Sequence, residues 1–396
     1  MRMALLLSTA AFEDFYGRVM GLDFKTYLDS FRNDFSWYYA RGLRDREVDV
    51  VLYVPSYLTR GLFEIGDGYR VRFLEMRDWY RVAWTGHRWL SRPPVGRYVQ
   101  EVANAVSFGR DLLSGLRSDR VDVLYVQEYW TGRFDFLARR AYVPRIGADH
   151  GDKGNRQLKI FKRGSFKRAS RITCQTEEEA LKASRLGARS VFLPNGVDES
   201  FFVPREGRAQ NPHHKTIITV ARLTDAQKRT SDLIGALKYL DDSWNLVVVG
   251  DGPDRAALKA KTRALGPRER IRSEGVISDC GALRALYHAS DVFAMPSAWE
   301  AVSLAVLEAL GCGLAVVVSD IPSLRSVIEG RINGIMFTVG DRRQLASSIA
   351  EAYELRDLLG SRARETIVRA FSGRAMLHRL GSIVEEAAAS GGFGGP

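Results

Sequence analysis

Short apolar runs alternate with longer amphipathic runs from one end of this sequence to the other. Within the short runs, apolar residues mostly follow each other directly, which is typical of parallel strands that are covered on both faces. The clearest of these runs are Thr216–Val220, Asn245–Val249, Asp291–Met295, Leu314–Ser319 and Gly334–Phe337. Helix-length stretches separate them, so the pattern predicts an α/β fold built from doubly wound domains.

The first half of the chain repeats this pattern in a weaker form. Its expected strands are Met3–Ser8, Val48–Val54, Val121–Gln127, Pro144–Ala148, Ile172–Gln175 and Ser190–Leu193. A chain of 396 residues is long enough for two domains. The polar, proline-containing segment 203–215 lies between the halves and has the composition of a linker. We therefore expect a first domain at 1–205, a second at 206–375, and at 376–396 a C-terminal helix that packs back on the first domain, followed by a disordered tail.

Composition narrows the choice of partners. With 58 Lys and Arg against 47 Asp and Glu, the net charge is +11. That charge favours phosphorylated small molecules, nucleic acid or an anionic membrane surface. Cys174, Cys280 and Cys312 are few and widely spaced, which suits a reducing compartment and argues against a disulfide framework. No apolar stretch approaches the length of a bilayer span. We expect a cytoplasmic protein, with peripheral attachment to the inner face of the membrane as an alternative.

Cationic residues follow the first strand of the second half. Loops at the carboxyl ends of parallel strands direct backbone N–H groups and helix dipoles at anions, so a ligand site is expected there. Arg222 leaves the end of strand Thr216–Val220, and Lys228 follows at the start of the next helix. Arg can bind two phosphate oxygens at once, and Lys acts as a point charge. Two solvated cations are the alternative interpretation.

Two further loops have weaker signals. Gly250 opens the sequence Gly250-Asp251-Gly252-Pro253, where glycines permit a tight turn. A simple turn explains this sequence as well as a phosphate-binding loop does. The segment Ser319–Ser323 is expected to form a turn and to begin a helix.

The segment 296–311 has the strongest signal. Glu300 lies in a loop after a strand, a helix is expected to open near Ser303 and Leu304, and Glu308 lies about one turn into it. A buried glutamate is rare without a partner. The two carboxylates can accept hydrogen bonds from sugar hydroxyls while the helix N-terminus binds a phosphate. The alternative is that Glu300 caps the helix and Glu308 is half-exposed.

Taken in order, these motifs resemble those of the retaining GT-B enzymes of glycosyltransferase family four. The set consists of Arg222 with Lys228, Gly250-Asp251-Gly252-Pro253, Pro296-Ser297 with Glu300 and Glu308-Ala309, Gly313 with Val318-Ser319-Asp320, and, in the first half, Pro194-Asn195-Gly196-Val197-Asp198. The resemblance covers roughly residues 120–370. It implies a GT-B fold, in which two Rossmann-like domains face each other across a cleft. The first domain would bind the acceptor and the second the nucleotide-sugar donor.

The resemblance also implies roles for individual residues. Arg222 and Lys228 would neutralise the donor diphosphate, and Glu300 would hold hydroxyls of the donor sugar. The backbone N–H groups of Ser303 and Leu304 would meet the phosphate or the sugar.

Further roles concern the nucleoside and the transfer site. Glu308 would bind the ribose hydroxyls, the backbone around Val276 would contact the base, and Gly250 would belong to the donor-binding turns. His150, after a first-domain strand, matches a position that lines the transfer site; an ordinary loop histidine is the alternative.

The implied reaction moves a hexosyl group from a UDP- or GDP-sugar to a saccharide, lipid-linked or small-molecule acceptor, with retention of configuration. The sequence contains no Asp-x-Asp motif, so we expect no metal and no other cofactor. One departure concerns the donor sugar. The family commonly has Glu-Gly-Phe-Gly where this chain has Glu300-Ala301-Val302-Ser303, which bears on the choice of sugar.

Other interpretations stay open at this point. The same fold serves sugar-nucleotide epimerases and catalytically silent proteins. A basic nucleic-acid-binding module fits the charge, although no recognisable nucleic-acid motif is present. The segments Arg77–Leu90 and Lys159–Arg168 mix aromatic and basic residues, which suits either an anionic lipid surface or helices with solvated cations.

Overall fold

The structure is a computed structural model that describes residues 1–7, 11–18, 20–31, 35–85, 94–149, 159–207, 214–264 and 270–390. The chain divides into two compact units, which we call unit 1 (Met1–Pro194 with Leu377–Pro396) and unit 2 (Asn195–Met376). His150 lies outside the described residues. So does the tail after Ser390, which the sequence predicts to be disordered.

Unit 1 is built on an eight-stranded sheet with the order β3-β4-β2-β1-β5-β6-β7-β8. Its strands are β1 (Arg2–Leu6), β2 (Asp49–Ser56), β3 (Gly61–Ile65), β4 (Tyr69–Glu75), β5 (Val123–Gln127), β6 (Arg145–Ala148), β7 (Arg171–Cys174) and β8 (Ser190–Phe192). The strands pair in parallel, except that β3 is antiparallel to β4. Strands β3 and β4 were not expected. In β3 partly buried and exposed residues alternate, as at the edge of a sheet, and β4 has the sequence Tyr-Arg-Val-Arg-Phe-Leu-Glu, so neither strand contains a continuous apolar run.

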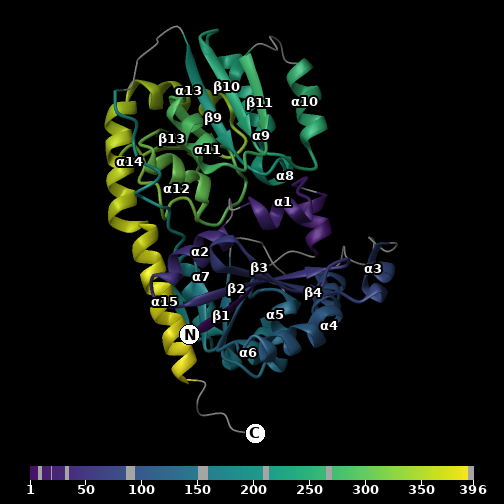
Figure 1. Ribbon diagram of the computed structural model, residues 1–396. Coiled ribbons are helices and arrows are strands. Elements are labelled where there is room, and N and C mark those ends of the chain that lie inside the picture. Colours follow the sequence, from purple (N-terminus) through teal and green to yellow (C-terminus); the bar gives the residue numbers. More distant parts are fainter. Residues whose placement is uncertain are drawn as a thin grey trace. The chain divides into compact units, whose positions relative to one another are not determined.

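The helices of unit 1 cover its sheet. They are α1 (Phe24–Asp29), α2 (Phe35–Arg44), α3 (Asp78–Thr85), α4 (Pro94–Ser118), α5 (Gly132–Arg140), α6 (Lys159–Arg168) and α7 (Glu177–Arg185). Helices α4, α5 and α6 lie together below the strands in Figure 1 and share one apolar core with them. Strand residues that point to the other face, such as Met3 and Leu52, are also buried. Burial on both faces explains the continuous apolar runs.

Unit 2 is built on a fully parallel sheet of six strands with the order β11-β10-β9-β12-β13-β14. Its strands are β9 (Lys215–Val220), β10 (Trp244–Val249), β11 (Ile271–Gly275), β12 (Val292–Met295), β13 (Ala315–Ser319) and β14 (Ile335–Phe337). Five of them match the expected runs. Strand β11, at one edge, was not expected because its sequence Ile-Arg-Ser-Glu-Gly is mostly polar.

Helices cover both faces of the second sheet. They are α8 (Asp225–Lys228), α9 (Thr230–Ala236), α10 (Arg255–Ala264), α11 (Cys280–His288), α12 (Leu304–Gly311), α13 (Arg342–Glu354) and α14 (Arg356–Ala370). One core joins alternate strand residues such as Ile218 and Phe293 to α11, α12 and α14. A second core joins their neighbours Ile217 and Val292 to α9, α10 and α13. This is the doubly wound arrangement that the sequence predicts.

The described segment 195–203 packs on unit 2, although the domain change was expected only after residue 205. The amide of Asn195 donates to Val302 O at 2.8 Å, and Val197 N donates to Phe371 O at 3.1 Å. Phe202 is buried in the core of unit 2. These contacts explain why the division falls at Pro194.

The last helix, α15 (Gly373–Ser390), belongs to unit 1 from Leu377 onward. Its side chains Leu380 and Val384 are fully buried. Glu385 pairs with Arg46 at 3.0 Å, and Glu386 pairs with Arg171 at 2.9 Å.

Candidate active site

The expected site residues lie around the point where the strand order of unit 2 changes direction. Strand β9 has β10 on one side and β12 on the other, so the chain winds outward from β9 in two directions. In open parallel sheets, ligands bind outside the carboxyl ends of the strands at such a point. Lys228 follows β9, and Glu300 follows β12.

Lys228 and Glu300 form an ion pair. The Nζ of Lys228 lies 2.6 Å from Glu300 Oε1, and the two side chains are 14% and 7% exposed. The loops that hold them are tied together, because Ala298 N donates to Gln227 O at 2.7 Å. A cation and a carboxylate are therefore fixed side by side at the edge of the sheet.

Glycines bring the loop after β10 against the loop after β9. Gly250 has a φ of +125°, and a Cβ there would lie 2.0 Å from Ala221 O. A Cβ on Gly252 would lie 2.5 Å from Leu223 O. Both positions require glycine. Because the N–H of Gly250 already donates to Gly275 O at 2.7 Å, we assign Gly250 to the shape of this loop. Arg222 emerges between the two packed positions and is exposed.

Helix α12 presents its N-terminus at the same edge of the sheet. Ser303 is the N-cap residue, and its side chain makes no capping hydrogen bond. The first N–H groups of a helix have no partner inside it, and they favour an anion. Asn195 holds the preceding residue Val302 in place. Ser303 and Leu304 thus lie where a phosphate can bind.

Glu308 lies on α12 and accepts a hydrogen bond from Tyr287. The distance from the Tyr287 hydroxyl to Glu308 Oε2 is 2.8 Å, and Tyr287 is fully buried. Burial raises the pKa of Glu308 from 4.5 to about 7, and the bond from Tyr287 opposes this rise. Burial likewise raises the pKa of Tyr287 well above its usual value. The carboxylate expected to bind ribose is therefore oriented by a neighbour but remains easy to protonate near neutral pH.

Sequence reasoning did not identify Tyr287. The available signal was its residue type, because a buried tyrosine hydroxyl usually finds a polar partner. Val276 directly follows β11 and is 37% exposed, so it is accessible at the edge where it was expected to contact a base.

The prediction that a helix begins in Ser319–Ser323 is wrong. The chain after β13 forms turns over residues 322–327. The side chain of Asp320 pairs with Arg325 at 2.5 Å instead of capping a helix. Hydrogen bonds from Leu324 N and Arg325 N to Ile321 O close the first of these turns.

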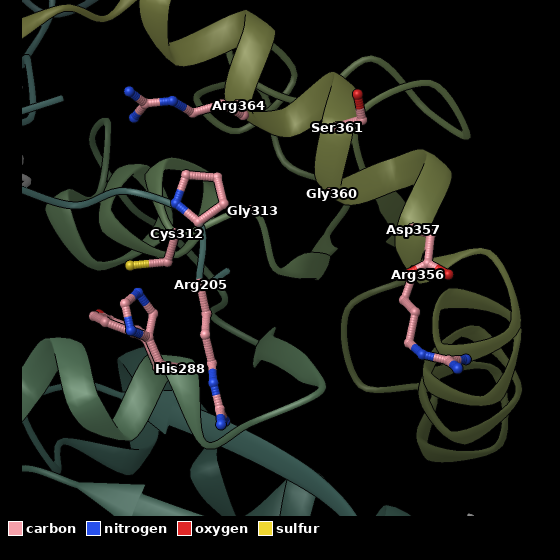
Figure 2. A pocket seen from close by; sticks show the side chains of 11 residues that line it. Arg205, His288, Cys312, Gly313, Arg356, Asp357, Gly360, Ser361 and Arg364 are labelled. Carbon is pink, nitrogen blue, oxygen red and sulfur yellow. The ribbon is translucent and has the colours of Figure 1, made fainter. Parts of the chain in front are cut away.

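Figure 2 shows a pocket of about 340 Å³ elsewhere in unit 2, lined by residues that include Arg205, His288, Arg356 and Arg364. None of the expected site residues lines it. The guanidinium groups of Arg356 and Arg364 point away from each other in Figure 2. Arg364 donates to Phe202 O and Glu199 O, which is a structural role. We do not place the donor in this pocket.

In the described part of the chain, no helix combines the length and the apolar character that crossing a bilayer requires. Of the two aromatic and basic segments, α3 covers residues 78–85 and α6 covers residues 159–168, while residues 86–90 lie outside the description.

Two family models match the chain. The model described as "Glycosyl transferases group 1" matches residues 204–367, and "Glycosyl transferase 4-like domain" matches residues 35–196.

Curated relatives match mainly over part of the chain. A GDP-mannose-dependent alpha-(1-6)-phosphatidylinositol dimannoside mannosyltransferase of Mycobacterium tuberculosis is 34% identical over 40% of this chain and 42% of that protein. A phosphatidyl-myo-inositol mannosyltransferase of Mycobacterium leprae is 28% identical over 52% of this chain and 56% of that protein. The chain thus spans about half the length of these relatives. A UDP-Gal:alpha-D-GlcNAc-diphosphoundecaprenol alpha-1,3-galactosyltransferase of Escherichia coli is 26% identical over 65% of this chain and 73% of that protein.

Solved structures match over nearly the whole chain. Sucrose-phosphate synthase from Thermosynechococcus elongatus has a TM-score of 0.77 at 16% identity, covering 98% of this chain and 100% of that one. Anabaena Alr3699/HepE in complex with UDP has a TM-score of 0.67 at 15% identity, covering 97% and 100%. With the two parallel-sheet units, these likenesses identify the GT-B fold.

Proposed function

The chain belongs to the GT4-type glycosyltransferases, and on this premise we propose that it transfers a hexosyl group from a nucleotide-diphosphate sugar to a saccharide or lipid-linked acceptor. The observation that supports this most is the ion pair of Lys228 and Glu300 at the switch point of the unit 2 sheet. A sugar and its β-phosphate are adjacent groups in the donor. A cation for the phosphate and a carboxylate for the sugar must therefore lie side by side, as these two do.

In the proposed complex the diphosphate lies between Lys228, Arg222 and the N-terminus of α12. Lys228 and Arg222 neutralise the phosphate charge, and the N–H groups of Ser303 and Leu304 add hydrogen bonds. Preorganised donors of this kind commonly contribute about 2.7–4 kcal/mol each to the stabilisation of a transition state. Glu300 holds sugar hydroxyls, and Glu308 accepts from the ribose.

The proposed reaction proceeds without a metal ion and with retention of configuration. The bond between the anomeric carbon and the phosphate oxygen breaks, and its electron pair stays on the departing diphosphate. The acceptor oxygen forms the new bond to the anomeric carbon, and its proton passes to the departing phosphate. The cations at the switch point stabilise the negative charge that develops there.

The names of the relatives support proposals for the nucleotide and for the acceptor. Among them, one is named for GDP-mannose and another for UDP-galactose, so we propose guanine or uracil as the base. Their acceptors are phosphatidylinositol dimannoside and a sugar linked to diphosphoundecaprenol, respectively. We therefore propose an acceptor that contains a phosphate group and is reached from the cytoplasm at the inner membrane surface.

The test is a thermal titration of the purified protein, in EDTA, with UDP, GDP, ADP, dTDP and CMP. A ligand at about 100 times its dissociation constant adds about 2.7 kcal/mol of stability. We expect UDP or GDP to raise the midpoint of unfolding, Glu308→Ala to lose most of that shift, and Glu354→Ala to keep it. Glu354 is an exposed glutamate on α13 and serves as the matched control.

A second measurement tests the chemistry. The nucleotide that binds is supplied as its mannose, glucose or galactose derivative, and NMR follows the anomeric configuration of the product in EDTA. A product of inverted configuration, or activity that returns only with a divalent cation, contradicts the proposed mechanism. Interconversion of the free nucleotide sugar without an acceptor indicates an epimerase. The absence of any nucleotide shift, with a salt-sensitive shift of nucleic acid in gels, indicates a nucleic-acid-binding protein.

A further inference from the structure

Unit 1 contains a pocket of about 600 Å³ where the ends of β2 and β4 meet α3 and α4, and we call it the α3–α4 pocket. Strands β2 and β4 are parallel neighbours, so their carboxyl ends lie at one edge of the sheet. Parallel sheets bind ligands outside this edge. The volume lies within the range of about 300–1,000 Å³ that is usual for sites of small molecules.

The acidic side chains in the α3–α4 pocket are largely engaged by the protein itself. Arg60 pairs with Glu75 at 3.0 Å and with Asp111 at 3.5 Å. Asp111 also accepts from Glu75 N at 2.9 Å. A ligand therefore meets two carboxylates whose charge one arginine already offsets in part.

Two arginines of the same pocket are not engaged in this way. The side chains of Arg77 and Arg110 make no hydrogen bond or ion pair with any residue in the described ranges, and both residues are exposed. The fold brings these two arginines to the same place although they are far apart in the sequence. Arg77 N donates to Ser107 O at 3.3 Å, and Arg110 follows Ser107 by one turn of α4. Asp78 also lines the pocket, and its carboxylate offsets part of the positive charge of the two arginines. Two guanidinium groups at one site favour a phosphate or a carboxylate, which each can bind through two oxygens.

An aromatic side chain forms another part of the wall. Trp79 lines the α3–α4 pocket and is 44% exposed. An indole offers a large, rigid apolar surface at low entropic cost, and the C–H face of a sugar ring can pack on it. The hydroxyl of Ser114, one turn further along α4, adds a polar group next to Arg110.

We propose that the α3–α4 pocket binds the acceptor as a saccharide with an anionic substituent, the sugar ring on Trp79 and the anion on Arg77 and Arg110. This inference rests on the proposed glycosyl transfer and assigns its acceptor to named residues. The shared chemistry is a sugar phosphate, which is found in soluble sugar phosphates and in sugars joined to a lipid by a diphosphate.

The experiment measures binding of glucose 1-phosphate to the full-length protein by isothermal titration calorimetry. Glucose alone and inorganic phosphate alone are run beside it. We expect glucose 1-phosphate to bind more tightly than either of them. Arg77→Gln and Arg110→Gln each weaken that binding about tenfold, which is the loss expected for one charge-assisted bond. Arg185→Gln, an exposed arginine on α7, leaves it unchanged.

Trp79→Ala separates the sugar from the anion. We expect it to weaken binding of glucose 1-phosphate and to leave binding of inorganic phosphate as it is. Equal affinity of the wild type for inorganic phosphate and glucose 1-phosphate overturns the sugar part of the proposal, and unchanged binding in both arginine variants overturns the whole of it. A short-chain prenyl diphosphate glucose that binds about tenfold better than glucose 1-phosphate identifies the lipid-linked source.

The nucleotide titration keeps this test apart from the proposed function. The thermal shift with UDP or GDP depends on unit 2, so the arginine variants of unit 1 retain it. A protein that shows this shift but does not bind glucose 1-phosphate keeps its donor site and loses only the acceptor proposal. A protein without the shift has lost the proposed function itself.

Discussion

Each unit of this protein contains a lysine paired with a carboxylate, and the two pairs differ in what surrounds them. In unit 1, Lys162 lies 3.0 Å from Asp135, and both side chains are almost completely buried at 1% and 2% exposure. Lys162 also donates to Tyr129 O at 2.9 Å and to Thr131 O at 2.7 Å. Two carbonyl oxygens accept from the ammonium group, a carboxylate lies beside it, and almost none of the side chain is exposed, so this lysine is not accessible to a ligand.

In unit 2, Lys228 has Glu300 as its acceptor within the described residues, at 2.6 Å. The pair is more open, at 14% and 7% exposure. Two of its donors remain for a substrate phosphate, and the nearby N-terminus of α12 favours the same charge. The comparison shows that burial and hydrogen bonds to backbone carbonyls distinguish a structural lysine from a lysine that is available to bind a ligand.

The largest change in stability is expected at the buried pair of Lys162 and Asp135. Lys162→Met leaves the carboxylate of Asp135 buried without its cation and two carbonyls without their donor. Removing one partner of a buried pair costs about 3–5 kcal/mol. We therefore expect a large fall in the free energy of unfolding of unit 1, followed by circular dichroism in urea, with the nucleotide shift of unit 2 retained. Lys167→Met, an exposed lysine on α6, is the control. A loss below about 1 kcal/mol would show that Lys162 is not structural.

Glu308 is an intermediate case, because it is partly buried and accepts its hydrogen bond from a neutral hydroxyl. Its pKa is raised from 4.5 to about 7, so between these values the folded protein holds a proton that the unfolded chain releases. The free energy of unfolding therefore falls as the pH rises through this window, and it levels off above it. The contribution is about 3 kcal/mol. Urea melts of wild type and Glu308→Gln across this range should show the slope in the wild type only. Parallel curves for the two proteins would contradict the raised pKa.

A smaller effect, on turnover, is expected at the more open pair of Lys228 and Glu300. Lys228→Ala removes a charge-assisted bond to the diphosphate, worth about 1.5–3 kcal/mol. We expect turnover with the nucleotide sugar to fall by about 10-fold to 150-fold, with a smaller loss of stability than in Lys162→Met. Lys238→Ala, an exposed lysine of unit 2, should keep full turnover. If Lys228→Ala stays within about twofold of wild type, Lys228 does not bind the phosphate.

The smallest effect is expected at Tyr287. Tyr287→Phe removes the hydroxyl that orients Glu308 and opposes the rise of its pKa, at a cost of about 0.5–1.5 kcal/mol. We expect nucleotide affinity to fall about threefold to tenfold near neutral pH and to recover in part at higher pH, as calorimetry at several pH values would show. A loss of affinity that is the same at every pH would make Tyr287 a packing residue only.

Much of the fold could be predicted because each sheet is covered on both faces. Burial on both sides makes central strands such as β12 (Val292–Met295) apolar throughout, and the expected bounds Asp291–Met295 differ from these by one residue. The edge strands β3 and β11 could not be found in this way, because one side of an edge strand faces solvent and its sequence keeps polar residues.

The site was predicted only in part. The segments that follow strands identified Lys228, Glu300 and Glu308 as candidates, because parallel strands bring those segments to one edge of the sheet. The side chains that bind these candidates could not be predicted from the sequence. Tyr287 lies on a different helix from Glu308, and no spacing in the sequence relates the two. The role of Arg222 as a phosphate ligand stays a prediction.

The sequence by itself determined the alternation of strand and helix, the glycines after β10 and the order of the charged loops, because these depend on local periodicity and backbone freedom. Only the tertiary structure decided which lysine is buried. Nothing in the sequence distinguishes Lys162 from the other cations of Lys159–Arg168, yet the fold buries it beside Asp135 and two carbonyls. It also decided that Arg77 and Arg110 share one pocket, because β4 and α4 bring them together. Burial and hydrogen-bond saturation depend on neighbours that are distant in sequence, and folding alone brings them into contact.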